Sequence, residues 1–226
     1  MQQISHMDFF RGSGIRRALS IAAVAIAAGT AAFLLSPESQ AKSDLGIGKL
    51  APDFSGIDSS GKPVKLSDYK GKTVVLEWTN HDCPYVVKHY GSGNMQALQK
   101  DATAKGVVWL SIISSAPGEQ GSVSAEAANA LTKQRAAAPT AVLLDPQGSI
   151  GRLYDARTTP HMFVVDKTGV LQYMGGIDDK PTSNTADIKT AKNYLSAALA
   201  AVADGKPVAD AVTRPYGCSI KYKGTT

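Results

Sequence analysis

Cys83 is the residue whose type and position most directly suggest chemistry. It is one of two cysteines in 226 residues, and Pro84 follows it. Residues 73–79 before it are apolar and β-branched, as in a buried strand, and a helical pattern begins at Pro84. Because proline is favoured at the first helical position, we expect the sulfur at a helix N-terminus. There the unpaired amides and the helix dipole favour thiolate over thiol and lower the cysteine pKa.

A buried structural cysteine is the alternative for Cys83, because free cysteine is among the most buried residue types. Such cysteines usually lie inside helices or strands. Cys83 instead lies at a loop-to-helix junction, beside His81, Asp82 and Tyr85. We therefore predict a reactive thiol at this position.

The elements that must position Cys83 alternate between strand and helix. Helical patterns cover 84–104, with a break near 91–93, a stretch beginning after Ser124, and one final helix from about 185 to 204. Strands and hairpins are predicted at 51–66, 73–79, 107–113, 141–144 and 161–174. This order predicts an α/β fold with a central mixed β-sheet, helices on both faces, an N-terminal hairpin and a C-terminal tail at 206–226.

Residues 1–41 have the order of a secretory signal peptide. Basic residues at 11, 16 and 17 precede an apolar run at 18–35, and Ser39-Gln40-Ala41 suits a cleavage site. The apolar run has the length of a membrane span, so a retained anchor is the competing reading and would give the protein a membrane contact. Residues 42–226 are then one exported domain, periplasmic if the source is a Gram-negative bacterium.

Composition excludes some partners and leaves others open. The formal net charge is +5, without a lysine or arginine run, so we expect no nucleic-acid partner. In an oxidising compartment the two cysteines either pair or cycle. His81, Cys83, His89 and His161 lack the tight paired spacing of structural zinc sites, so we predict no metal and no cofactor, with His89 a partly exposed helix residue.

Nearly the whole of 42–226 resembles the thioredoxin-fold redoxins, and specifically the peroxiredoxin-like branch of the alkyl hydroperoxide reductase and thiol-specific antioxidant family. The third of four matching stretches is the most specific, because the resemblance implies that Pro160 is cis and faces Cys83. The stretches are Ala51-Pro52-Asp53-Phe54, Asn80-His81-Asp82-Cys83-Pro84, residues 158–166 (TTPHMFVVD), and residues 215–222 (PYGCSIKY).

The resemblance suggests roles for three further residues. Pro160 lacks an N–H, which leaves its neighbour's backbone free to pair with a substrate chain or to brace the sulfur; an ordinary trans proline at a strand start is the alternative. Arg157 either holds a thiolate or peroxide oxygen or is an exposed loop residue. Glu77 lies where thioredoxins carry a buried acid that shuttles a proton. The alternative is a strand-end charge paired with a lysine such as Lys72.

The chain also departs from the family pattern. Val86 stands where the thioredoxin Cys-x-x-Cys motif has its second cysteine, so there is no adjacent resolving thiol. Leu76 and Asn80 replace the proline and threonine of the peroxiredoxin motif. Asn80 can donate a hydrogen bond as threonine does, but the replacement puts fast peroxidase chemistry in doubt.

Cys218, in the C-terminal tail, has three possible roles. It is a resolving thiol for oxidised Cys83, half of a permanent disulfide, or a cysteine that never meets Cys83. Sequence does not decide between them, because pairing requires Cα atoms within about 7 Å.

The resulting prediction is a thiol-dependent oxidoreductase with peroxiredoxin-like antioxidant chemistry. Its Cys83 thiolate reduces peroxides or protein disulfides, and Cys218 or an external thiol donor resolves the product. Two alternatives stay open: a thiol-disulfide oxidoreductase without peroxidase activity, and a non-catalytic thioredoxin-fold binding module.

Overall fold

The computed structural model describes residues 45–224. The signal peptide predicted over residues 1–41 lies outside the described residues. Within them, no helix has the length and apolar character needed to cross a membrane.

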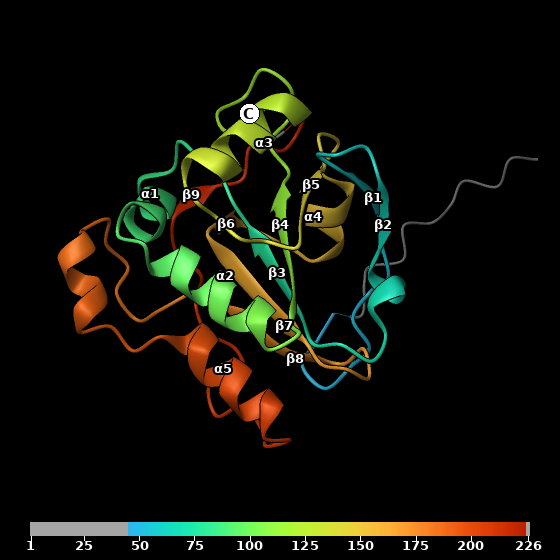
Figure 1. Cartoon of the computed structure of the whole chain (residues 1–226), viewed down its shortest axis with the longest axis vertical. Helices are drawn as coiled ribbons and strands as arrows, with labels where there is room; N and C mark the ends of the chain where they lie inside the picture. The colour runs from blue at the N-terminus through green and yellow to red at the C-terminus, as the bar shows by residue number, and fades with distance from the viewer. Residues whose placement is uncertain (1–44, 225–226) are drawn as a thin grey trace, which may run out of the picture. The chain divides into compact units, whose positions relative to one another are not determined.

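A seven-stranded mixed sheet forms the centre of the described residues (Figure 1). Its strand order is β2-β1-β5-β4-β3-β7-β8, and a separate two-stranded sheet pairs β6 with β9. Strands β3, β4 and β5 are parallel to one another, whereas β1 and β7 run antiparallel to their neighbours. The strands are β1 (Ser55–Asp58), β2 (Pro63–Lys65), β3 (Val74–Trp78), β4 (Val108–Ile113), β5 (Ala141–Leu144), β6 (Thr158–Thr159), β7 (His161–Val165), β8 (Leu171–Gly175) and β9 (Cys218–Ser219).

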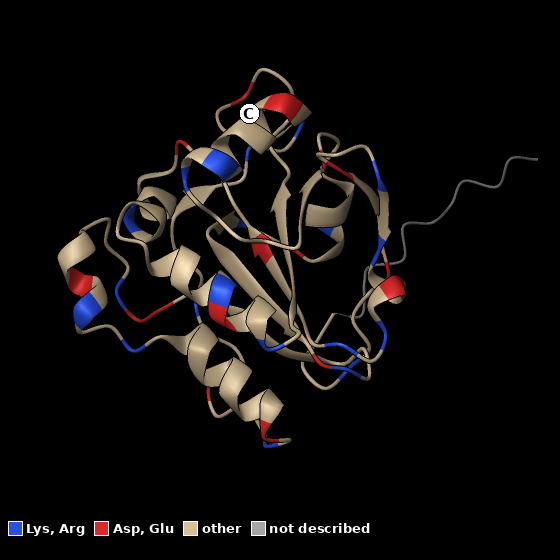
Figure 2. Cartoon of the chain, viewed as in Figure 1, with Lys and Arg blue, Asp and Glu red and all other residues tan. Residues whose placement is uncertain are grey.

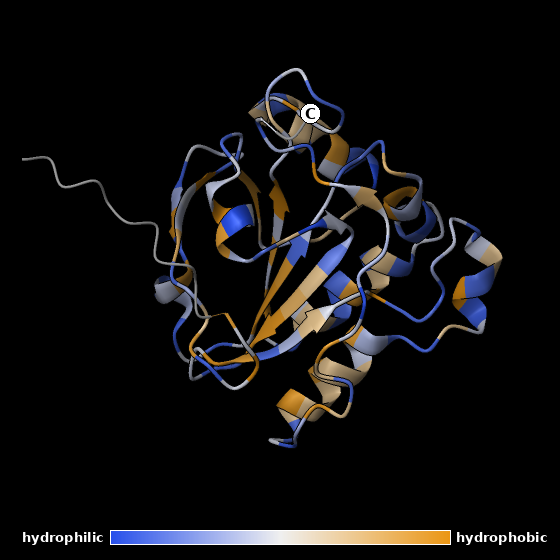
Figure 3. Cartoon of the chain, turned by 180° about the vertical axis from the view of Figure 1, so that it is seen from behind, coloured by the Kyte–Doolittle hydropathy of each residue, from blue (hydrophilic) through white to orange (hydrophobic). Residues whose placement is uncertain are grey.

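Helices cover both faces of this sheet, as the sequence predicts. The central strands β3, β4 and β7 are mostly apolar (orange in Figure 3) and are buried along almost their whole length, which is the pattern of strands that are covered on both faces. The helices are α1 (Pro84–Gly91), α2 (Asn94–Ala104), α3 (Ala125–Gln134), α4 (Ser149–Leu153) and α5 (Tyr194–Ala203), with 3-10 turns η1 (Leu66–Tyr69) and η2 (Thr185–Lys189).

Alternate residues of β3 face two different cores. Val74, Leu76 and Trp78 join the core that α4 covers, and Trp78 packs against Tyr154 with ring centroids 5.5 Å apart. Val75 joins the other core, which includes Cys83 and side chains of α1, α2 and α5. The period-2 alternation of β3 therefore decides which side chains can reach Cys83.

The prediction of a single final helix over 185–204 is wrong. The structure has η2, a break, and then α5 beginning at Tyr194. Asn193 explains the break, because its side chain accepts a hydrogen bond from the Ser196 amide at 2.8 Å and caps α5. The helical pattern continues through the break, so periodicity alone could not locate it.

The tail after α5 returns to the sheet and forms β9 near α1 (Figure 1). Its last described residues lie next to α4, where Arg152 donates to the Lys223 carbonyl at 2.8 Å. In β9, Cys218 pairs with Thr159 and Ser219 with Thr158, in antiparallel register. The tail thereby brings the second cysteine to the strand that precedes Pro160.

Candidate active site

Cys83 caps the N-terminus of α1, as predicted. Pro84 occupies the first turn, and the Cys83 carbonyl accepts the first helical hydrogen bond, from the Val87 amide at 2.9 Å. The Cys83 amide donates to the Asn80 carbonyl at 3.2 Å, which fixes the turn between β3 and α1. The side chain is fully buried, with 0% of its surface exposed.

The cover over Cys83 is made by two backbone segments. The Thr159–Pro160 peptide is cis, as the resemblance implies, and the Cys83 thiol donates to the Thr159 carbonyl at 3.1 Å. From the tail, the Cys218 amide donates to Cys83 Sγ at 3.4 Å. Both cysteines are free thiols. The backbone before Pro160, expected to pair with a substrate chain, pairs here with the protein's own tail.

The environment of the two sulfurs separates their pKa values. Burial raises the pKa of Cys83, but hydrogen bonds with Cys218, with Thr159 and with the Val86 amide outweigh burial and lower it below the ordinary value. Burial and the neighbouring Cys83 sulfur raise the pKa of Cys218 to about 12. Cys83 is therefore the thiolate of the pair, and Cys218 is the thiol that donates to it.

We expect these pKa values to appear as two well-separated thiolate transitions in the ultraviolet absorbance of the reduced protein. The Cys83 step lies below pH 9, and the Cys218 step lies near pH 12. In Cys218→Ala the remaining step moves to higher pH, because burial still opposes ionisation while the stabilising hydrogen bond is gone. An unchanged step in Cys218→Ala would contradict the assignment.

The same values fix the sign of the effect of pH on stability. The pKa of Cys83 is lower in the folded state than in the unfolded state, so ionisation of Cys83 stabilises the fold at high pH, and this contribution is lost as pH falls through the folded value. Cys218 has the opposite sign, because its stabilising proton is lost as pH rises toward about 12.

Gly217 permits the close approach of the tail. Its φ is +136°, and a Cβ atom there would lie 1.9 Å from the Thr159 carbonyl oxygen. A side chain at this position would therefore overlap the backbone that Cys218 pairs with. The cover over Cys83 depends on this glycine.

Asn80 shapes the active turn, and its polar atoms do not contact the sulfur. Its Oδ1 accepts from the Asp82 amide at 2.9 Å, and its Nδ2 donates to the Gln120 carbonyl at 3.3 Å. Gly121 packs on the same amide, where a Cβ would lie 2.3 Å from Asn80 Cγ. The amide that was expected to donate to a peroxide is thus engaged with the backbone.

Arg157 lies away from the sulfur pocket. Its guanidinium pairs with Asp155, and 72% of its side chain is exposed. Its backbone carbonyl, in contrast, accepts from the Ile220 amide at 3.0 Å and helps to hold the tail. The structure thus corresponds to the second of the two readings, an exposed arginine on a loop.

Glu77 is fully buried in the central strand β3, and among the described residues no lysine pairs with it, so the lysine alternative is wrong. Lys and Arg lie mainly at the periphery of the fold (Figure 2). Its carboxylate accepts from four neutral donors. These are Tyr90 Oη at 2.8 Å, Gln99 Nε2 at 3.2 Å, Trp109 Nε1 at 2.7 Å and Ser111 Oγ at 2.9 Å. Cys83 is not among these donors, although one of them, Tyr90, lies on the helix that Cys83 caps. The network satisfies a buried charge, as burial requires.

His89 corrects another expectation, because it is fully buried rather than partly exposed. Burial lowers its pKa to about 4. Its Nε2 lies 3.2 Å from Tyr216 Oη, and Lys88 and Asp178 contact the same hydroxyl. Sequence reasoning did not single out Tyr216, and its place two residues before Cys218 was the available signal.

Within residues 45–224, no group of three or more His, Cys, Asp or Glu side chains lies close enough together to hold a metal ion.

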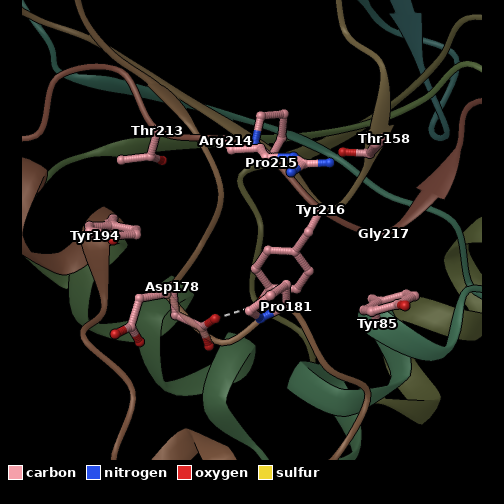
Figure 4. Close-up of a pocket in the computed structure, with 11 residues that line it drawn as sticks. Tyr85, Thr158, Asp178, Pro181, Tyr194, Thr213, Arg214, Pro215, Tyr216 and Gly217 are labelled. Carbon is pink, nitrogen blue, oxygen red and sulfur yellow. Dashed lines mark hydrogen bonds between the residues drawn. The ribbon is translucent and has the colours of Figure 1, made fainter.

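A cavity of about 540 Å³ opens beside the tail segment that leads to Cys218 (Figure 4). Tyr85, Tyr194 and Tyr216 contribute its aromatic wall, and Thr158 and Gly217 border it next to the paired strands. Tyr85 and Tyr216 meet edge to face, with ring centroids 5.8 Å apart. The cavity gives solvent and small molecules access to one flank of the cover over Cys83.

Comparison with known proteins agrees with this geometry. The model of the AhpC/TSA family matches residues 47–174, which include β1 to β7 and most of β8. No curated protein matches the chain.

Two solved structures resemble most of the chain. One is a hypothetical protein from Sinorhizobium meliloti 1021, with 25% identity and a TM-score of 0.67, covering 80% of this chain and 96% of that one. The other is an uncharacterized conserved protein from Geobacillus kaustophilus, with 27% identity and a TM-score of 0.66, covering 81% of this chain and 96% of that one.

Proposed function

Because this chain belongs to the AhpC/TSA family and is a thioredoxin-fold thiol oxidoreductase, we propose that it carries out thiol–disulfide exchange with Cys83 as nucleophile and Cys218 as resolving thiol. The observation that carries the proposal is the pairing of β9 with β6. It places Cys218 next to Cys83, with the Cys218 amide 3.4 Å from Cys83 Sγ. The tail thus supplies the second thiol that the sequence around Val86 lacks.

The first step is attack of the Cys83 thiolate on one sulfur of a partner disulfide. A bond forms between Cys83 and that sulfur, and the partner's other sulfur leaves as a thiolate. In the second step Cys218 gives its proton to the partner thiolate released in the first step and attacks Cys83 Sγ, and the bond between Cys83 and the partner sulfur breaks. That sulfur leaves as a thiolate and takes a proton from solvent. The products are a Cys83–Cys218 disulfide and a partner dithiol, so two electrons have passed to the partner.

The charge on Cys83 also controls when Cys218 can react in the second step. While Cys83 is a thiolate, its charge helps to raise the pKa of Cys218, which stays protonated and unreactive. Once Cys83 is part of a mixed disulfide, that charge is gone, and the pKa of Cys218 falls. The resolving thiol is therefore activated only after the first bond has formed.

The substrate must displace the tail, because the Cys83 sulfur is fully buried under β6 and β9. The cavity beside residues 213–217 lies on the side from which the tail can be reached. An external thiol then reduces the Cys83–Cys218 disulfide and restores the dithiol. If residues 1–41 act as the predicted signal peptide, this cycle takes place in an exported, oxidising compartment.

Trapping of the intermediate tests this proposal. We expect Cys218→Ser to accumulate a mixed disulfide at Cys83 when mixed with a disulfide such as oxidised glutathione, because the resolving attack is removed. Wild-type protein should instead form the intramolecular disulfide, and Cys83→Ser should form no adduct at Cys218. Mass spectrometry of unreduced peptides reads all three results.

Peroxide reduction is the second chemistry that the sequence predicts. The engaged amide of Asn80 and the outward position of Arg157 give it less support than exchange receives. Hydrogen peroxide in the same trapping assay distinguishes the two. Faster formation of sulfenic acid at Cys83 than of the mixed disulfide, at equal reagent concentration, would overturn the proposal in favour of a peroxidase.

A further inference from the structure

A cluster of buried ionisable side chains lies next to the site and takes no part in the exchange steps. Lys88, His89 and Asp178 are each at most 3% exposed. Lys88 Nζ lies 3.4 Å from Asp178 Oδ2 and donates to the Lys180 carbonyl at 2.8 Å. Buried ion pairs often add little net stability, so this pair is weak evidence for a stabilising role.

All three side chains converge on the hydroxyl of Tyr216. The hydroxyl donates to Asp178 Oδ1, and Lys88 Nζ lies 3.4 Å from its oxygen. Asn94 Nδ2 lies 2.8 Å from His89 Nδ1, which assigns the ring proton to Nε2, 3.2 Å from Tyr216 Oη. Figure 4 shows the bond between Tyr216 and Asp178 at the edge of the cavity.

The position of Tyr216 in the chain connects this cluster to the sulfurs. Cys83 is the cap of α1, and Lys88 and His89 lie in the last turn of the same helix. Tyr216 lies two residues before Cys218 in the tail. One helix and one tail segment are therefore joined at two points, at the sulfurs and at the Tyr216 hydroxyl.

We propose that Lys88, His89, Asp178 and Tyr216 form a latch that positions Cys218 for its reaction with Cys83. The proposal rests on the proposed function, and within it Tyr216 is a positioning residue. The latch limits the conformations of the tail, so it raises the effective concentration of Cys218 at Cys83 and favours the intramolecular disulfide. It also keeps the Cys218 amide and thiol directed at the Cys83 sulfur.

Tyr216→Phe tests the latch, because it removes the hydroxyl and keeps the ring against Tyr85. We expect the equilibrium constant for forming the Cys83–Cys218 disulfide, measured against a glutathione buffer, to fall about 10-fold. That change corresponds to a reduction potential about 30 mV less negative. The pKa of Cys83 should rise in the same variant, because the hydrogen bonds from Cys218 are held less firmly.

Tyr154→Phe is the matched control. It also removes a buried tyrosine hydroxyl, which donates to the Pro52 carbonyl at 2.6 Å, but in the other core of the sheet from the one that Cys83 and Tyr216 join. Its disulfide equilibrium should equal that of wild-type protein even if its stability falls. Asp178→Asn is the second latch variant and should shift the equilibrium in the same direction as Tyr216→Phe.

The outcomes separate failure of the latch from failure of the exchange proposal. A disulfide equilibrium and a Cys83 pKa in Tyr216→Phe that match those of Tyr154→Phe would overturn the latch and leave the exchange mechanism standing. A wild-type protein that forms no Cys83–Cys218 disulfide in any glutathione buffer would overturn the exchange mechanism itself.

Discussion

Gly217→Ala is expected to expose Cys83 and raise its rate of alkylation about 100-fold. A Cβ at Gly217 would lie 1.9 Å from the Thr159 carbonyl oxygen, at a φ of +136° that non-glycine residues rarely adopt. Overlap and backbone strain together cost about 3 kcal/mol in the paired arrangement. Since each 1.4 kcal/mol is a factor of ten, the open form gains about two powers of ten in population.

The measurement is the rate of iodoacetamide addition to Cys83 in the reduced protein, followed on the peptide that contains it. Gly61→Ala provides the control. Gly61 also has a positive φ, of +83°, but a Cβ there would meet no other atom within 4 Å. Its alkylation rate should equal that of wild-type protein. Equal rates in Gly217→Ala and Gly61→Ala would show that β9 does not cover the sulfur.

The same substitution should impair resolution. Cys218 is held at Cys83 by its pairing with Thr159, and the displaced tail loses the contact between the Cys218 amide and Cys83 Sγ. Gly217→Ala should therefore accumulate the mixed disulfide that Cys218→Ser accumulates, although its Cys218 thiol is present. A variant that exposes Cys83 and still resolves at the wild-type rate would contradict the positioning role of β9.

The place of Cys83 could be predicted from sequence because local rules decide it. An apolar β-branched run, a turn and a Cys-Pro pair specify a strand, a loop and a helix start within about ten residues. The hairpin of β7 and β8 was predictable for the same reason, since Asp166 and Gly169 build its turn locally. The mixed sheet with helices on both faces follows from the order of such elements.

The pairing of Cys218 could not be predicted, because it depends on contacts 135 residues apart in the chain. The tail contains little regular secondary structure. Its position depends on the close approach at Gly217 and on the contacts of Tyr216 with the buried cluster. Arg157 shows the same limit at shorter range. It is three residues from Pro160, but spacing along a loop does not determine the direction of a side chain, and Asp155 takes its guanidinium.

The sequence also identified Glu77 as anomalous without explaining it. The sequence leaves two readings for Glu77: a buried acid that moves a proton for Cys83, and a strand-end charge paired with a lysine. The structure supplies neutral donors from α1, α2 and β4. The most distant of these donors, Ser111, is 34 residues from Glu77 in the chain, so no local motif could reveal them.

Glu77→Leu should lower the free energy of unfolding by about 4 kcal/mol. Leucine fills the space but accepts no hydrogen bond, so the indole N–H of Trp109 and the hydroxyl of Ser111 lose the carboxylate oxygen that they share. Each buried donor left unsatisfied costs about 1–3 kcal/mol. Denaturant unfolding of the two proteins gives the difference directly.

Glu77→Gln separates this structural role from proton transfer to Cys83. Its carbonyl oxygen can keep the bonds from Trp109 and Ser111, so it should lose much less stability than Glu77→Leu. Because the donors to Glu77 do not include Cys83, Glu77→Gln should form the mixed disulfide at a rate within about twofold of wild type, with the same dependence on pH. If Glu77 is instead the acid that moves the proton, Glu77→Gln should fold normally and lose exchange activity. A folded Glu77→Gln that forms the mixed disulfide slowly would therefore show that Glu77 takes part in proton transfer. A folded Glu77→Gln with the wild-type rate would show that Glu77 has only the structural role of joining β3 to α1, α2 and β4.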